Sequence, residues 1–150
     1  MIQLRDANAD DIPWLLEQLK DFSDFFGSKH SLFPSKKYGT EKLRELIEGH
    51  VMCVAHSDIE AKPCVGFISG ILAPHFFNPE IIVLTELFWW VTPEWRNTRT
   101  GLMLLEEFIK VGTQKANWIL MTLEEDSPVN PTSLIKRGFK VKEHNYLKEV

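Results

Sequence analysis

Residues 85–105 of this chain read Thr85-Glu86-Leu87-Phe88-Trp89-Trp90-Val91-Thr92-Pro93-Glu94-Trp95-Arg96-Asn97-Thr98-Arg99-Thr100-Gly101-Leu102-Met103-Leu104-Leu105. The apolar and aromatic run from Leu87 to Val91 has the composition of a central strand covered on both faces. Pro93 ends this strand because proline has no N–H group to give to a sheet. A polar turn over 96–100 then leads into Gly101 and an amphipathic helix. This order directs free backbone N–H groups and the positive end of a helix dipole at one point, so the sequence predicts a phosphate-binding turn.

The same residues resemble a known family. The run Arg96-Asn97-Thr98-Arg99-Thr100-Gly101 is similar to the Arg/Gln-x-x-Gly-x-Gly/Ala motif of the GNAT superfamily of acetyl-CoA-dependent N-acetyltransferases, and Val91-Thr92-Pro93-Glu94-Trp95 resembles its lead-in. Lys136-Arg137-Gly138-Phe139 is similar to a second motif near the end of that fold, so the resemblance spans nearly the whole chain. The first glycine of the motif lets the backbone approach a pyrophosphate closely, and in this chain Arg99 stands in its place. The arginine fork could instead pair with phosphate.

The resemblance implies a cofactor site for acetyl-CoA. Backbone amides of Arg96, Asn97, Thr98, Arg99, Thr100 and Gly101 would bind the pyrophosphate, and the strand backbone at Trp89, Trp90 and Val91 would hold the pantetheine. Asn130 resembles a family asparagine that contacts the pantetheine or pyrophosphate arm. It could equally cap the helix that Pro131 begins, and both roles are compatible.

Composition narrows the class of protein. The chain has 150 residues, of which 44% are hydrophobic and 25% charged, as in one globular domain over 1–150. A net charge of −4 and a pI near 5.7 argue against nucleic acid as the main partner. No apolar run approaches the about 20 residues of a membrane span, and the first residues lack a signal-peptide pattern, so we expect a cytoplasmic protein without a membrane partner. Cys53 and Cys64 are expected to be reduced, although a bridge between neighbouring strands stays open.

Hydrophobic periodicity predicts the elements of one α/β (α+β) domain. The expected order is β-α-α-β-β-β-α-β-α-β(β), with a mixed, GNAT-like sheet of six to seven strands flanked by about four helices. We expect a connector over 24–38, a second helix capped by Thr40, a loop over 74–79, and a bulge or close backbone approach at Gly66 and Gly70. The other expected elements are strands over 2–5, 50–56, 64–72, 81–91 and 118–123, helices from 12, from 101 and over 130–136, and one or two closing strands over 139–150.

Acetyl transfer to an amine needs a base that takes the amine proton. Glu86 is the best candidate, because burial beside an apolar strand would raise its pKa towards the useful range; the alternative is a strand carboxylate that faces solvent or pairs with lysine. Many family members carry a tyrosine as thiolate acid where this chain has Leu134. Tyr146, on an expected closing strand, could reach the site, although a core or edge role is the alternative, and bound water could serve instead.

Several side chains have a structural alternative to a functional role. Phe25, Phe26 and Phe33 could line an acceptor pocket, but core packing is the expected role, as it is for the rings of Trp89 and Trp90. His75 is expected to be a solvated loop residue. The histidines show no ligand spacing, so we predict no metal.

The sequence therefore predicts a GNAT-type N-acetyltransferase whose acceptor is a small-molecule amine or a protein amine, with a homodimer left open. The run Glu86-Leu87-Phe88-Trp89 resembles phage-encoded acetyltransferases. A GNAT-shaped binding module without activity is the rival hypothesis, because of Arg99 and Leu134. A third hypothesis is an unrelated nucleotide-binding domain. The sequence disfavours it, because the turn has neither the glycine pattern of a dinucleotide-binding motif nor that of a Walker loop.

Overall fold

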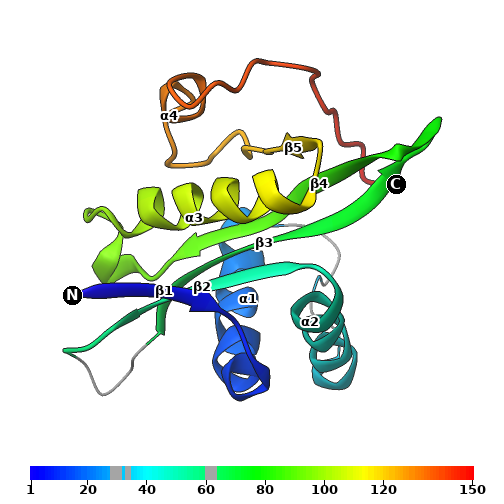
Figure 1. Ribbon diagram of the computed structural model, residues 1–150. Helices are drawn as coiled ribbons and strands as arrows, with labels where there is room; N and C mark the ends of the chain where they lie inside the picture. Colours follow the sequence, from blue (N-terminus) through cyan, green and yellow to red (C-terminus); the bar gives the residue numbers. More distant parts are fainter. Residues whose placement is uncertain (28–31, 33–34, 60–63) are drawn as a thin grey trace.

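The computed structural model describes residues 1–27, 32, 35–59 and 64–150. Its elements are β1 (Ile2–Asp6), the 3₁₀ turn η1 (Ala9–Asp11), α1 (Ile12–Phe26), α2 (Lys36–Gly49), β2 (Val51–Ser57), β3 (Cys64–His75), β4 (Asn78–Val91), η2 (Pro93–Trp95), α3 (Thr100–Lys115), β5 (Trp118–Leu120) and α4 (Thr132–Ile135). Helix α3 covers one face of the sheet, and α1 and α2 lie on the opposite face (Figure 1). Within the described residues, no helix is both long and apolar enough to cross a membrane.

The sheet has five strands in the order β1-β2-β3-β4-β5. Neighbouring strands from β1 to β4 are antiparallel, whereas β5 is parallel to β4. The mixed α+β class is therefore confirmed, but the expected closing strands are not: residues 139–150 form no strand and are almost entirely exposed. These residues pair with none of the five described strands, so their backbone lacks the hydrogen-bond partners that a strand needs. The sheet is smaller than the six to seven strands predicted.

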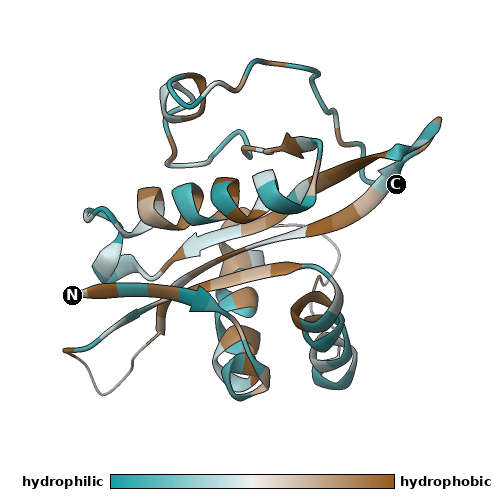
Figure 2. Ribbon diagram, in the orientation of Figure 1, coloured by the Kyte–Doolittle hydropathy of each residue, from teal (hydrophilic) through white to brown (hydrophobic). Residues whose placement is uncertain are grey.

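Two apolar cores lie on the two faces of the sheet. Leu15, Leu19 and Leu43 of α1 and α2 pack against Phe67 on one face, and Leu104 and Phe108 of α3 belong to the core on the other. Hydrophobic and hydrophilic residues alternate along the helices (Figure 2), which is the pattern that buries one side of each helix against the strands. The sheet thus separates an α3 side from an α1–α2 side.

The helix boundaries correct two predictions about the connector. Helix α1 continues to Phe26, so the connector expected over 24–38 starts too early. Helix α2 is capped by Ser35, whose hydroxyl oxygen accepts a hydrogen bond from the Tyr38 backbone N–H at 3.2 Å. Thr40 is therefore not the cap; its hydroxyl donates to the Lys36 carbonyl one turn earlier. The first turn of α2 was missed because it holds Gly39, a residue that disfavours helix interiors.

The β3–β4 hairpin is longer than predicted and contains a bulge. Both strands extend into the expected loop over 74–79, so that only Phe76 and Phe77 join them. Farther along, Ser69 lies opposite Phe88 and Gly70 opposite Glu86, which leaves Leu87 as the extra residue. A Cβ atom added at Gly70 would lie 2.7 Å from the Thr85 carbonyl oxygen, so the predicted close backbone approach at this glycine is confirmed.

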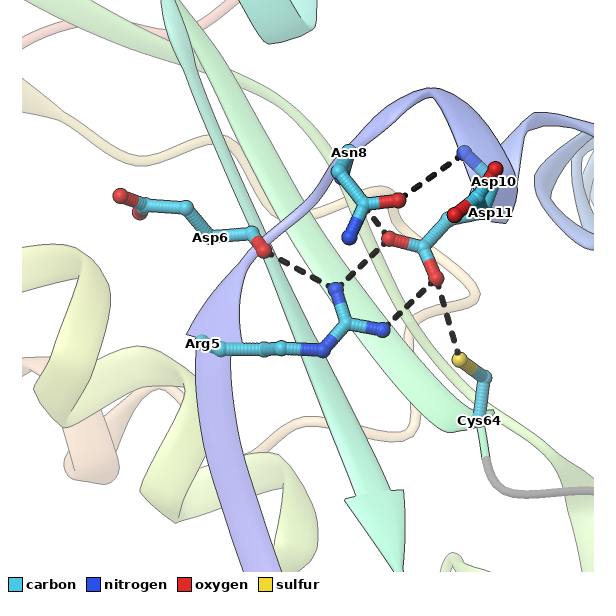
Figure 3. A network of polar contacts seen from close by, with 6 residues as sticks. All are labelled: Arg5, Asp6, Asn8, Asp10, Asp11 and Cys64. Carbon is cyan, nitrogen blue, oxygen red and sulfur yellow. Dashed lines mark hydrogen bonds and ion pairs between the residues drawn. The ribbon is translucent and has the colours of Figure 1, made fainter.

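A polar network around the buried Asp11 carboxylate fixes the start of α1 (Figure 3). The Arg5 guanidinium donates to both carboxylate oxygens of Asp11, at 2.7 and 2.8 Å, and the Asn8 backbone N–H donates to the same carboxylate at 2.8 Å. The Cys64 thiol lies 3.6 Å from Asp11 Oδ1. Burial raises the pKa of Cys64 to about 11 and that of Cys53 to about 12, and both cysteines are free thiols, as expected.

Candidate active site

The site lies where β4 and β5 separate. The two strands pair only between Val83–Thr85 and Trp118–Leu120. Beyond this point, the second half of β4 and the chain after β5 line a cavity of about 470 Å³. Its walls also include the end of α1 and the start of α3, so the cavity reaches elements on both sides of the sheet. The lining residues are Phe22, Phe25, Phe26, Glu86, Leu87, Trp89, Trp90, Val91, Pro93, Arg96, Asn97, Gly101, Thr122, Leu123, Glu124, Ser127, Pro128 and Val129.

Glu86 is the buried ionisable group of this cavity. Its side chain stands directly before the bulge and is 7% exposed. One carboxylate oxygen accepts a hydrogen bond of 3.3 Å from the Thr122 backbone N–H across the gap. Burial raises the pKa of Glu86 to about 7; the Thr122 bond opposes this shift and the negative charge of Glu124 adds to it. The expected burial and raised pKa are confirmed, and the solvent-facing alternative is excluded.

The phosphate turn, residues 96–101, leads directly into α3, a helix of 16 residues. The Thr98 hydroxyl oxygen accepts a hydrogen bond from the Thr100 backbone N–H at 3.2 Å and lies 2.8 Å from the Thr100 hydroxyl. The backbone N–H groups of Gly101 and Leu102 have no hydrogen-bond acceptor among the described residues. With the positive end of the helix dipole, they form a site that favours an anion.

The two arginines of this turn, Arg96 and Arg99, lie in different surroundings. Arg99 is exposed and has φ −75° and ψ −2°, a conformation that needs no glycine. Arg96 is held against β4: its Nε–H donates to the Val91 carbonyl at 3.0 Å, and its guanidinium carbon lies 4.4 Å from the ring centre of Trp90. Asn97 and Gly101 line the cavity beside it.

The tryptophan pair occupies both sides of the sheet. Trp90 is 7% exposed, and its indole N–H donates to the Gln18 side-chain oxygen at 3.1 Å. Trp89 and Val91 belong to the core beneath α3. Core packing of both rings is therefore confirmed, and all three residues also contribute to the cavity wall.

Aromatic rings from the end of α1 form the opposite wall. Phe25 and Phe26 line the cavity, although core packing was the expected role, and Phe25 is 48% exposed. Phe33 lies outside the described residues. The ring of Phe22, for which the sequence predicted no functional role, also lines the cavity. The spacing of Phe22, Phe25 and Phe26 continues the apolar face of α1, which could have indicated their common direction.

The remaining predicted residues lie outside the cavity wall. Tyr146 is 92% exposed in the C-terminal segment, so the structure does not bring it to Glu86. Asn130 is exposed, and its side-chain oxygen accepts from the Thr132 backbone N–H at 2.9 Å, which agrees with helix capping. His75, which was expected in a solvated loop, lies at the end of β3 with its ring 5.2 Å from that of Trp118. Across the described chain, no group of three His, Cys, Asp or Glu residues is placed to hold a metal ion.

The part of the cavity wall contributed by 122–129 was missed from the sequence. Thr122, Leu123 and Val129 follow β5 without regular secondary structure. We expected the strand to continue to Leu123, but it ends at Leu120. No motif marks these residues. The only available signal was their place after a strand that neighbours β4.

Comparisons with known proteins relate this geometry to one fold. No protein-family model and no curated protein matches the chain. Among solved structures, an acetyltransferase from Trypanosoma brucei is 18% identical over 100% of both chains, with a TM-score of 0.75. A predicted acetyltransferase from Clostridium acetobutylicum, solved with acetyl-CoA, is 15% identical over 99% of this chain and 96% of its own, with a TM-score of 0.74. This chain has the fold of GNAT-type acetyltransferases.

The GNAT-type fold does not by itself fix the activity. A transcriptional regulator from Bacillus halodurans is 15% identical over 100% of both chains and has a TM-score of 0.77. Function must therefore be argued from the residues of the cavity.

Proposed function

We propose that this protein is an N-acetyltransferase that transfers the acetyl group of acetyl-CoA to a primary amine, with Glu86 as the general base. One observation carries the proposal: a carboxyl group with a pKa of about 7 lines the same cavity as the start of α3. A buried carboxylate with few partners is costly for a protein, and such groups gather at sites of proton transfer. The acetyl-CoA bound to the Clostridium acetobutylicum neighbour supports the choice of cofactor.

The residues of the cavity fit a bound acetyl-CoA. The free N–H groups of Gly101 and Leu102 suit the pyrophosphate. The backbone of Trp89, Trp90 and Val91 faces a gap with no strand paired to it on that side, so its polar groups can bind the amides of the pantetheine. Arg99 is exposed beside the helix start, where its guanidinium can add a phosphate contact in place of the missing glycine.

Glu86 supplies the proton acceptor that the reaction needs. A pKa of about 7 suits a base that works near neutral pH. Acetyl-CoA supplies the acetyl group: the amine nitrogen forms a bond to the thioester carbon, the carbon–sulfur bond breaks, and its electron pair leaves with sulfur. The proton released by the amine passes to Glu86, directly or through water.

The departing sulfur must gain a proton. Water in the cavity can supply it, and this route requires no acidic side chain. The assignment of this step to Tyr146 remains a prediction from the sequence, and its 92% exposure gives it no support. The phage-encoded type likewise rests only on the run from Glu86 to Trp89.

The rival function is a GNAT-shaped module that binds a partner and performs no chemistry. Arg99 in the motif and Leu134 in place of tyrosine favour it, and Leu134 is indeed a buried core residue of α4. The shared cavity of Glu86, Asn97 and Gly101 favours the enzyme, because an inactive module has no need to bury a carboxyl group there.

Calorimetric titration with acetyl-CoA, and separately with CoA, tests the cofactor assignment. We expect saturable binding by the wild-type protein and its loss in the Arg96→Ala/Gly101→Asp double variant. A side chain at Gly101 would have its nearest contact at 3.7 Å, with Val91, so the fold should tolerate this change. Arg44→Ala, on the exposed surface of α2, is the control for lost positive charge.

The outcomes separate the hypotheses. Binding by the wild-type protein justifies assays with amines, whereas unchanged affinity in the double variant contradicts the assignment of the phosphate turn. No binding at millimolar acetyl-CoA would favour the binding module.

A further inference from the structure

We propose that the acceptor is a monoamine carried on a flat, apolar body, such as an arylalkylamine, and that it binds against Phe22, Phe25, Phe26 and Trp90. This inference rests on the proposed function, because it names the substrate class of the same cavity. We call these four residues the aromatic half of the cavity.

The cavity offers two different environments on the two sides of the sheet. Gly101 and the free N–H groups at the start of α3 lie on the α3 side, where they suit the phosphates. The aromatic half lies on the other side: α1 packs there, and Trp90 belongs to the core of α1 and α2. Once the cofactor is assigned to the α3 side, the aromatic half is the space left for the acceptor. Glu86 stands at the bulge between them.

The rings of the aromatic half form a continuous apolar wall, in which Phe22 and Phe26 are tilted against each other and the other neighbouring rings are packed edge to face. The ring centres of Phe22 and Trp90 are 5.8 Å apart and those of Phe25 and Trp90 5.9 Å, with interplanar angles of 76° and 70°. Phe26 is 4.7 Å from Phe22 and 5.0 Å from Phe25. Phe25 keeps 48% of its surface exposed, so its ring is accessible to a ligand. An aromatic acceptor gains both apolar burial and ring contacts on such a wall.

The charges around this wall favour one amino group over several. Among the described lining residues, the ionisable side chains are Glu86, Glu124 and Arg96. The Arg96 guanidinium lies 4.4 Å from the ring centre of Trp90 and 5.4 Å from that of Phe25, so a positive charge stands directly on the aromatic half. A polyamine would have to place further ammonium groups beside this arginine, and like charges in a partly buried site repel strongly.

A polar acceptor is disfavoured for a separate reason. A sugar amine needs hydrogen-bond partners for its hydroxyl groups, and the rings of the aromatic half provide none. Hydroxyl groups moved from water to such a wall lose hydrogen bonds without replacement.

Acetyl transfer to phenethylamine, spermidine and glucosamine tests the inference, measured as kcat/KM at fixed, saturating acetyl-CoA. We expect phenethylamine to exceed both other amines by about tenfold or more, since contacts that one substrate makes and another lacks set such ratios. Phe25→Leu keeps an apolar side chain but removes the ring. It should lower kcat/KM for phenethylamine about three- to tenfold, mainly through KM, and leave acetyl-CoA affinity unchanged. Phe76→Leu, at the hairpin tip where the ring is 89% exposed, is the matched control and should change neither.

The result can separate this inference from the proposed function. Equal or better turnover of spermidine or glucosamine would overturn the acceptor class while leaving acetyl transfer intact. If no amine is acetylated, titration of the CoA-loaded protein with phenethylamine decides: saturable binding that Phe25→Leu weakens upholds the aromatic acceptor site although the catalytic proposal fails. Absence of such binding overturns the inference.

Discussion

Asp11 and Glu86 are two carboxyl side chains with little exposed surface, 6% and 7%, whose pKa values are shifted in opposite directions. Asp11 receives two hydrogen bonds from Arg5 and one from Asn8 (Figure 3). Burial alone would raise its pKa, but these bonds and the Arg5 charge outweigh burial and hold the pKa below the ordinary value. Among the described residues, Glu86 has one hydrogen bond, of 3.3 Å from the Thr122 backbone N–H, and no ion pair, so burial prevails and its pKa rises to about 7.

The comparison shows that hydrogen-bond and charge partners, together with the depth of burial, separate a structural carboxylate from a chemical one. The bonds to Asp11 satisfy its charge and join β1 to the start of α1, so this residue stabilises the fold. Glu86 is left with unused hydrogen-bonding capacity directed at a cavity. A protein tolerates such a group at a cost in stability, and the cost is understandable if a substrate proton completes the bonding.

The largest expected effect concerns catalysis. Glu86→Gln should lower kcat about 100- to 10,000-fold, because glutamine cannot accept the amine proton, and should leave acetyl-CoA affinity nearly unchanged. Steady-state kinetics and calorimetry measure the two quantities. Glu80→Gln, an exposed position on the same strand, is the matched control and should retain full activity. Equal loss of turnover and affinity would show that Glu86 is structural and would remove the contrast with Asp11.

The contributions of Glu86 and Asp11 to the free energy of unfolding should change with pH in different pH ranges. Between pH 4.5 and about 7, the folded protein keeps a proton on Glu86 that the unfolded chain releases, so stability falls as pH rises through this window. The loss should be on the order of 3 kcal/mol, and Glu86→Gln should abolish it. Asp11 acts oppositely: its contribution is present above its ordinary pKa of 3.8 and is lost only as pH falls through its lower folded value. Urea unfolding across pH measures both, and a Glu86→Gln curve parallel to wild type would contradict the raised pKa.

Removal of the Asp11 charge should lower the free energy of unfolding and leave the catalytic rate nearly unchanged. Asp11→Asn takes away the charge that Arg5 pairs with, and we expect a loss of about 2–3 kcal/mol in the free energy of unfolding. Arg5 is 38% exposed and can reach water, which limits the loss. The kcat per folded molecule should stay within about twofold of wild type, since Asp11 lies in a separate network. A large loss of kcat in a protein that remains folded would mean that the two carboxylates are coupled.

The sequence predicted the chemical role of Glu86 but not the structural role of Asp11. Glu86 was identifiable because an acidic residue interrupts an apolar strand ten residues before the arginine of a recognisable turn. The role of Asp11 was not, since it depends on Arg5 in β1, six residues earlier, and on Cys64 in β3, which the fold brings near it from 53 residues away. Patterns of neighbouring residues in the sequence predict strands, turns and helices. A hydrogen bond between distant residues depends on how the strands are aligned in the folded sheet, which those patterns do not give.

The same limit explains the other differences between sequence and structure. The order of the first nine elements followed from periodicity and turn residues. The expected strands over 139–150 did not form, because a strand needs a neighbour and alternation alone does not supply one. The contacts of Arg96 could not be predicted either. Trp90 lies in β4 and Phe25 in α1, and no spacing rule brings both rings to this arginine.

The smallest expected effect tests how far the surroundings of Glu86 set its pKa. Glu124 lines the same cavity, and its negative charge contributes to the raised pKa after burial. Glu124→Gln should therefore move the rise of kcat/KM with pH towards lower pH, in a direct comparison with wild type. Since Glu124 is exposed, salt screens its charge, and the difference between the two profiles should shrink at 1 M salt, where the Debye length is about 3 Å. A profile shifted equally at all salt concentrations would indicate a changed cavity shape instead of a lost charge. In that case burial, and not the charge of Glu124, would account for the raised pKa of Glu86.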